Sequence, residues 1–170
     1  LGAALVKGSS IDLGAGDDVL RLEFAHLNKD ATVNGGEGTD ALVFTNAADF
    51  SSQSDLDKLN ATTGFEVLGV TGSVTLTVDS TKADFSDFLV SDSGQITLTN
   101  AQDNDTVTFG AGVSASNSIT MAAWNTVLDL NLAGDDTNIA NVTATIDATT
   151  INIDSTGPDR KSTRLNSSHH

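Results

Sequence analysis

Between residues 1 and 156 the chain contains many short strings in which apolar residues occupy alternate positions. A period of two places the apolar side chains on one face of an extended strand. Thr, Val and Ile are frequent in these strings, and their branched Cβ atoms fit a pleated backbone. The clearest strings predict strands over residues 67–70, 74–78, 96–99, 107–109, 127–132, 142–146 and 151–153.

Two stretches, residues 54–59 and residues 80–88, carry the start signals of a helix. Each begins with Ser, which caps helix N-termini, and has an acidic residue close behind it. Both stretches are short, so we expect one or two helical turns on a β framework. Gly, Asp, Asn and Ser separate the predicted strands and favour turns. The pattern as a whole therefore predicts an all-β fold.

The chain also repeats imperfectly. The nonapeptide pattern GGxGxDxUx, where U is a large apolar residue, is complete within residues 34–43 (NGGEGTDALV) and lacks only the first Gly in residues 13–21 (LGAGDDVLR). The two copies are 22 residues apart, which is about one turn of a solenoid built from short strands. Weaker echoes follow at Asp103 and Asp105 and at Asp135 and Asp136, where flanking glycines are fewer or absent. There we expect solvated turns that stack without metal.

The chemistry of the repeated motif points to calcium. Glycine allows the backbone of a small turn to bring carbonyl oxygens inward, and the Asp adds a charged oxygen. Ca²⁺ takes six to eight oxygen ligands, so one loop supplies about half a shell and the ion would lie between stacked loops. The apolar U residue points into the solenoid core. The predicted side-chain ligands are Asp18 and Asp40, with Asp17 as an auxiliary carboxylate and Gly14, Gly16, Gly36 and Gly38 as backbone contributors. For either loop alone, the alternative is a glycine turn without metal.

Composition removes several other classes of function. The 170 residues include 23 acidic and 8 basic side chains, a formal net charge of −15. Such a surface repels nucleic-acid phosphate and anionic lipid, so we expect no nucleic-acid partner. The chain has no Cys, which excludes disulfides and thiolate metal sites. No apolar run approaches the roughly 20 residues of a membrane span, so we expect no direct membrane insertion.

The last twelve residues differ in texture from the rest. Residues 159–170 (DRKSTRLNSSHH) resemble the translation of a common DNA-sequencing adapter. We interpret them as a non-native, disordered tail. Residues 1–158 are then expected to form a single β-solenoid segment, a fragment of a larger protein.

The two glycine and aspartate motifs resemble the RTX calcium-binding repeats of secreted bacterial proteins. Residues 36–43, followed by residues 63–70, resemble the β-strand-repeat segments of RTX-type S-layer and giant surface proteins. This resemblance implies a right-handed parallel β-solenoid, calcium-dependent assembly and type I secretion to the bacterial cell surface. It also implies a structural or adhesive role, with calcium ions, further copies in a surface lattice, or a host or surface ligand as partners.

An enzymatic role is not expected. His26 is the only histidine outside the tail, so we expect neither a Ser-His-Asp triad nor a His-rich metal centre. Arg21 is the only arginine outside the tail and the lysines are scattered, so no cationic cluster is expected to hold an anionic sugar. Trp124 and the seven Phe residues would serve either as a sugar-binding platform or, as we favour, as core. Two alternatives to the surface protein stay open: a non-catalytic RTX module of a larger secreted enzyme, and a metal-free Ig-like adhesin domain with antiparallel hairpins.

Overall fold

A computed structural model describes residues 2–110, 112–113, 116–121, 127–132, 141–145, 150–155 and 166–167. Almost all regular structure in these ranges is short β-strand. The strands are β1 (Ser10–Asp12), β2 (Val19–Leu22), β3 (Thr32–Asn34), β4 (Ala41–Phe44), β5 (Ala48–Asp49), β6 (Thr62–Thr63), β7 (Val67–Thr71), β8 (Thr75–Asp79), β9 (Asp87–Ser91), β10 (Gln95–Ala101), β11 (Thr106–Phe109), β12 (Ser116–Met121), β13 (Val127–Leu132), β14 (Asn141–Thr145), β15 (Thr150–Ser155) and β16 (Asn166–Ser167).

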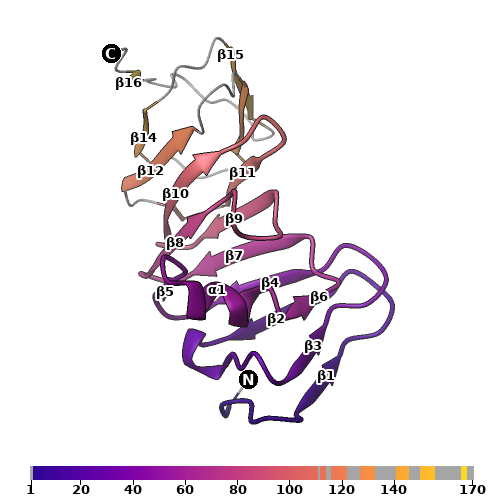
Figure 1. Cartoon of the computed structure of the whole chain (residues 1–170). Coiled ribbons are helices and arrows are strands. Elements are labelled where there is room, and N and C mark those ends of the chain that lie inside the picture. Colours follow the sequence, from indigo (N-terminus) through magenta and orange to yellow (C-terminus); the bar gives the residue numbers. More distant parts are fainter. Residues whose placement is uncertain are drawn as a thin grey trace.

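The strands stack as a parallel β-solenoid of about five turns, which confirms the predicted fold class (Figure 1). One sheet runs in the order β15-β13-β11-β9-β7-β4-β2 and a second in the order β16-β14-β12-β10-β8-β5. Every pairing of named strands is parallel. The Ig-like alternative is therefore wrong, because that sandwich is built from antiparallel hairpins.

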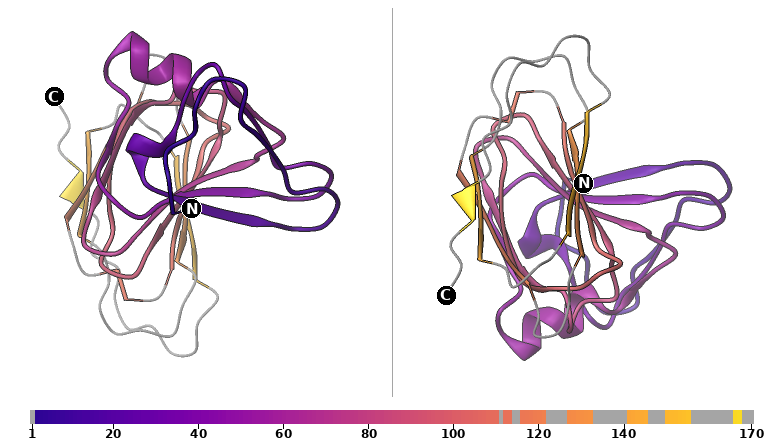
Figure 2. Two further views of the ribbon diagram at one scale, coloured as in Figure 1. Left: turned by 90° about the horizontal axis from the view of Figure 1, so that it is seen from below. Right: turned by 90° about the horizontal axis from the view of Figure 1, so that it is seen from above.

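The N-terminal coils have an additional side. Strands β1, β3 and β6 form a third parallel sheet, in that order, and each precedes a strand of the seven-stranded sheet along the chain. The loops that join this third sheet to β2 and β4 project from the rest of the solenoid (Figure 2). They carry the glycine and aspartate motifs. From β9 onward the described strands alternate between the two large sheets alone.

Inward side chains form continuous columns through the stack. In the seven-stranded sheet, Leu42 pairs with Leu68, Leu68 with Phe88, and Phe88 with Val107. All four are buried. Burying a side chain of this size stabilises a fold by roughly 1.5–3 kcal/mol. This column explains why alternation predicted these strands: each coil places its apolar residue directly over that of the previous coil.

The predicted helix at residues 54–59 is confirmed as α1 (Gln53–Leu59). The hydroxyl of Ser52 caps it by accepting a hydrogen bond from the backbone N–H of Asp55, and Leu56 and Leu59 are buried. Phe44 and Phe50 lie in the same core, and Phe24 packs edge-on against both.

The other Phe residues, Phe65, Phe85, Phe88 and Phe109, are also buried, so core packing is confirmed for these side chains. Trp124 lies outside the described residues.

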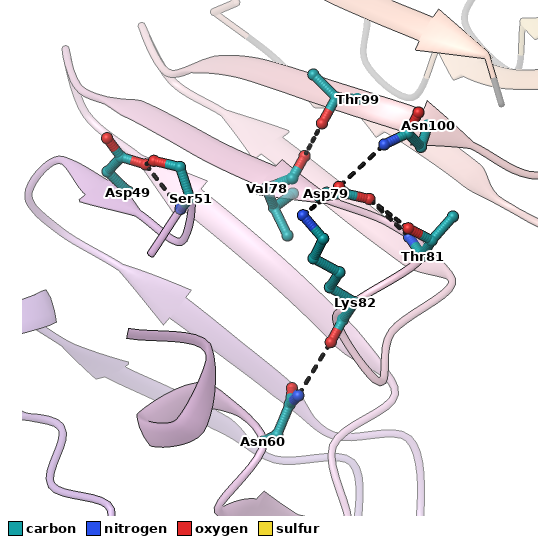
Figure 3. A network of polar contacts seen from close by, with 9 residues as sticks. All are labelled: Asp49, Ser51, Asn60, Val78, Asp79, Thr81, Lys82, Thr99 and Asn100. Atoms are coloured by element: carbon teal, nitrogen blue, oxygen red, sulfur yellow. Dashed lines mark hydrogen bonds and ion pairs between the residues drawn. The ribbon is translucent and has the colours of Figure 1, made fainter. Parts of the chain in front are cut away.

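The helix predicted over residues 80–88 is wrong. Residues 80–82 form a turn, and β9 begins at Asp87. The Asp79 carboxylate holds this turn by accepting hydrogen bonds from the Thr81 backbone N–H (3.1 Å), the Thr81 hydroxyl (2.6 Å) and Asn100 Nδ2 (2.9 Å), and it pairs with Lys82 Nζ at 3.0 Å (Figure 3). Asp79 thus organises a corner instead of a helical start.

Two residues of the C-terminal tail are described. Asn166 and Ser167 form β16, which pairs in parallel with Thr143 and Ala144 of β14. The predicted turn at Asp135 and Asp136 lies outside the described residues. Across the described ranges, no helix has both the length and the apolar character needed to cross a membrane.

Candidate functional site

The two motif loops, residues 13–18 and 35–40, lie directly on one another. Ala15 and Glu37 form a parallel bridge. The Gly16 N–H donates to the Glu37 carbonyl at 2.8 Å, and the Glu37 N–H donates to the Gly14 carbonyl at 2.8 Å. The 22-residue repeat predicted from the sequence is therefore one coil, and its loops are joined backbone to backbone.

Glycine is required where these loops touch. All four predicted motif glycines, Gly14, Gly16, Gly36 and Gly38, have positive φ angles. A Cβ atom on Gly36 would lie 1.7 Å from the Gly14 carbonyl oxygen, and one on Gly38 would lie 2.3 Å from the Gly16 carbonyl oxygen. A side chain at position 36 or 38 would thus push the two coils apart.

Asp40 is the most distinctive residue of the site. It is 0 % exposed. Its Oδ1 accepts a hydrogen bond from the Asp18 backbone N–H at 2.7 Å and so connects the second coil to the first. Its Oδ2 is buried and has no hydrogen-bond partner. Since desolvating an ionised carboxylate is costly unless the charge is compensated, this oxygen is the atom of the site that most needs a ligand.

The other two predicted carboxylates lie differently. Asp17 is exposed, and its Oδ1 accepts a hydrogen bond from the Thr39 backbone N–H at 2.9 Å. Asp18 is half-buried and contacts the second coil through its main chain. Its N–H donates to Asp40 Oδ1, and its carbonyl accepts the Ala41 N–H at 2.9 Å. The structure thus brings Asp17, Asp18 and Asp40 to one pair of loops, with Asp40 alone fully buried.

Sequence reasoning missed a third coil at this site. Ala41 pairs with Val67, so Glu66 stands beside Asp40. Glu66 Oε2 accepts a hydrogen bond from the Asp40 backbone N–H at 2.7 Å. Gly64, two residues earlier, has a φ of 64° and lies against the backbone of Gly36. The string Gly64-Phe65-Glu66 matches the Gly-x-Asp end of the motif, with Glu in place of Asp.

These residues fit a hard cation in part. No group of three or more carboxylate or imidazole side chains suited to a metal ion occurs in the described part of the chain. What the loops do offer is an unpartnered carboxylate oxygen, Asp40 Oδ2, close to the Gly64 carbonyl oxygen, and such a mixture of carboxylate and carbonyl oxygens is one that Ca²⁺ accepts. The Gly14 carbonyl already accepts one hydrogen bond, so its second lone pair is what remains for a ligand.

The expectation of a solvated turn at Asp105 is wrong. Asp105 is 1 % exposed. Its Oδ2 accepts hydrogen bonds from the Ser80 hydroxyl and the Gln102 backbone N–H, while its Oδ1 is buried without a partner. Burial, helped by the nearby charge of Asp87, raises the pKa of Asp105 despite those two hydrogen bonds. The neighbouring Asp103 is exposed, and its Oδ1 accepts the Val127 N–H.

Comparison with known proteins adds no relative: no family model, no curated protein and no solved structure matches the chain.

Proposed function

We propose that this chain is a calcium-binding structural segment of a secreted bacterial surface protein of the RTX-repeat, S-layer-like kind. The observation that carries the proposal is the buried, unpartnered Oδ2 of Asp40 at the point where the glycine loops stack. A divalent cation would compensate this charge and tie neighbouring coils together. The role is mechanical, and the proposal includes no catalytic step.

Calcium would act on folding in this proposal. Metal ligands rarely stand ready in an unfolded chain, so the free energy of binding becomes free energy of folding. The segment would be weakly ordered where free calcium is scarce and would fold after export, where calcium is abundant. The acidic surface, with its net charge of −15, would then keep the exposed coils soluble and provide the surface for a lattice or an adhesive contact.

The test compares the chelated protein with the same protein after calcium is added. Thermal unfolding followed by circular dichroism should show a higher midpoint with calcium, because a ligand that binds only the folded state stabilises it. At 100 times the dissociation constant this amounts to about 2.7 kcal/mol. A wild-type midpoint that is the same with chelator and with calcium would reject the proposal.

Asp40→Asn separates a ligand role from a packing role. The amide keeps an oxygen to accept the Asp18 N–H, and it removes the uncompensated charge. We expect the variant to remain folded without calcium and to lose the calcium response. Glu37→Gln is the matched control, since Glu37 is exposed on the same loop and should retain the full response.

A further inference from the structure

The free oxygen of Asp40 lies on the side of the third coil. A Cβ atom placed on Gly35 would stand 2.8 Å from Asp40 Oδ2 and 1.9 Å from the Gly64 carbonyl oxygen. Both oxygens are therefore close to the same face of Gly35. The other carboxylate oxygen, Oδ1, is already used by the Asp18 N–H of the first coil. The two oxygens of Asp40 thus serve different neighbours, and the unpartnered one belongs to the contact between the second and third coils.

Glu66 brings a second carboxylate to this contact. Its Oε2 accepts the Asp40 N–H at 2.7 Å, and the Asp40 carbonyl accepts the N–H groups of Glu66 and Val67, both at 3.0 Å. The Asp40 peptide is therefore fixed against the third coil from both sides. Glu66 is exposed, so its carboxylate remains open to solvent and to an incoming ion.

The charges at this contact have one sign. Asp40, Glu66 and the Gly64 carbonyl all present oxygen, while the ion pairs formed by Lys29, Lys58 and Lys82 neutralise Asp30, Asp55 and Asp79 elsewhere. The buried Asp40 carboxylate is poorly solvated, and the neighbouring Glu66 carboxylate repels its charge unless a cation lies between them.

We infer that the cation of the proposed function lies between the second and third coils, where it is bound by Asp40, Glu66 and the Gly64 carbonyl. This inference depends on the proposed function and changes its ligand set. Glu66 replaces Asp18 as the second carboxylate, and Gly64 joins the main-chain ligands. Two carboxylates and one carbonyl leave several positions of a shell of six to eight oxygens to water.

The experiment is a calcium titration of chelated protein by isothermal titration calorimetry, with three variants beside the wild type. Glu66→Gln should weaken calcium binding by roughly tenfold or more, because calcium affinity follows the number of charged ligands. Gln keeps an oxygen for the Asp40 N–H, so the fold is retained. Asp18→Asn and the control Glu37→Gln should bind calcium almost as tightly as the wild type.

The outcomes separate the inference from the proposed function. If Asp18→Asn weakens binding as much as Glu66→Gln, or if Glu66→Gln binds like the wild type, the ion is not between these coils although the protein binds calcium. If the wild type itself binds no calcium, the proposed function fails and the inference with it. Hydrogen exchange on the wild type gives an independent reading: calcium should slow exchange at Glu66 and Val67 more than at Gly16.

Discussion

Asp40 and Asp105 occupy equivalent positions in two regions of the solenoid and meet different surroundings. Each precedes the first residue of a strand in the seven-stranded sheet, and each is buried with one unpartnered carboxylate oxygen. Asp40 lies in the three-sided N-terminal region among glycine loops, and its bonded oxygen reaches the backbone of another coil. Asp105 lies in the two-sided region, where a buried hydroxyl, that of Ser80, and the N–H of Gln102 hold its bonded oxygen.

The difference shows what the glycines add. In the N-terminal loops Gly35 leaves room for the Gly64 carbonyl oxygen close to the Asp40 carboxylate, and in the proposed function a cation compensates the charge there. At the later corner no such loop is present and Asp87 adds negative charge, so the natural compensation is a proton. If the proposed calcium site is correct, the same acidic position serves metal binding in one region and proton binding in the other, depending on the backbone around it.

The largest expected effect comes from closing the glycine contact. Gly36→Ala would place a methyl group 1.7 Å from the Gly14 carbonyl oxygen at a φ of 118°. Because the overlap with the backbone adds to the strain of a positive φ, we expect the free energy of unfolding, measured by urea denaturation, to fall by about 3–5 kcal/mol.

Gly14→Ala is the matched control for this prediction. Gly14 also has a positive φ, but no atom lies within 4 Å of its Cβ position. Gly14→Ala should be destabilised only by the strain of a positive φ, which lowers the free energy of unfolding by about 1–2 kcal/mol. Equal losses in the two variants would mean that contact between the loops contributes nothing beyond backbone conformation.

The sequence predicted many of the strands correctly. Alternation identified β7, β8, β10, β11, β13, β14 and β15, because inward apolar columns impose a period of two on these strands. It did not identify β9, where Ser80 and its neighbours imitate a helix start and only the Asp79 network, which involves Asn100 of the next coil, decides against one. Local signals could not reveal a contact between coils.

The same limit applied to the site. The nonapeptide predicted that Gly36 and Asp40 would meet the first loop, and they do. It could not predict Glu66, because the step from Asp18 to Asp40 is 22 residues and that from Asp40 to Glu66 is 26, lengthened by the insertion that contains α1. Register between unequal coils is set by packing. The burial of Asp105 was missed for the same reason, since its partner Ser80 is 25 residues away.

An intermediate effect is expected at the Asp79 corner, where an acid is well compensated. Burial alone would raise the pKa of Asp79, but the hydrogen bonds from Thr81, Asn100 and Lys82 lower it below its usual value. The stabilisation is therefore complete above the usual pKa and is lost as the pH falls through the lowered one. Asp79→Asn should lower the free energy of unfolding by about 1–3 kcal/mol at neutral pH and by progressively less in acid, measured by urea unfolding across pH. A cost that does not change with pH would show that the charge plays no part.

The smallest effect, with the opposite pH dependence, is expected at Asp105. Because its pKa is raised in the folded protein, the folded state binds the proton more tightly than the unfolded chain, and stability falls as the pH rises from the usual carboxyl pKa to the raised one. Asp105→Asn removes this loss, so the difference in unfolding free energy between variant and wild type, measured by urea unfolding across pH, should shift in favour of Asn with rising pH. Ser80→Ala is the control: it deletes a donor to the carboxylate and should destabilise the protein most at pH values above the raised pKa of Asp105, where that carboxylate is charged. If Asp79→Asn and Asp105→Asn respond to pH with the same sign, the two corners do not differ in how their charges are compensated, and the contrast between hydrogen-bonded and proton-binding corners is wrong.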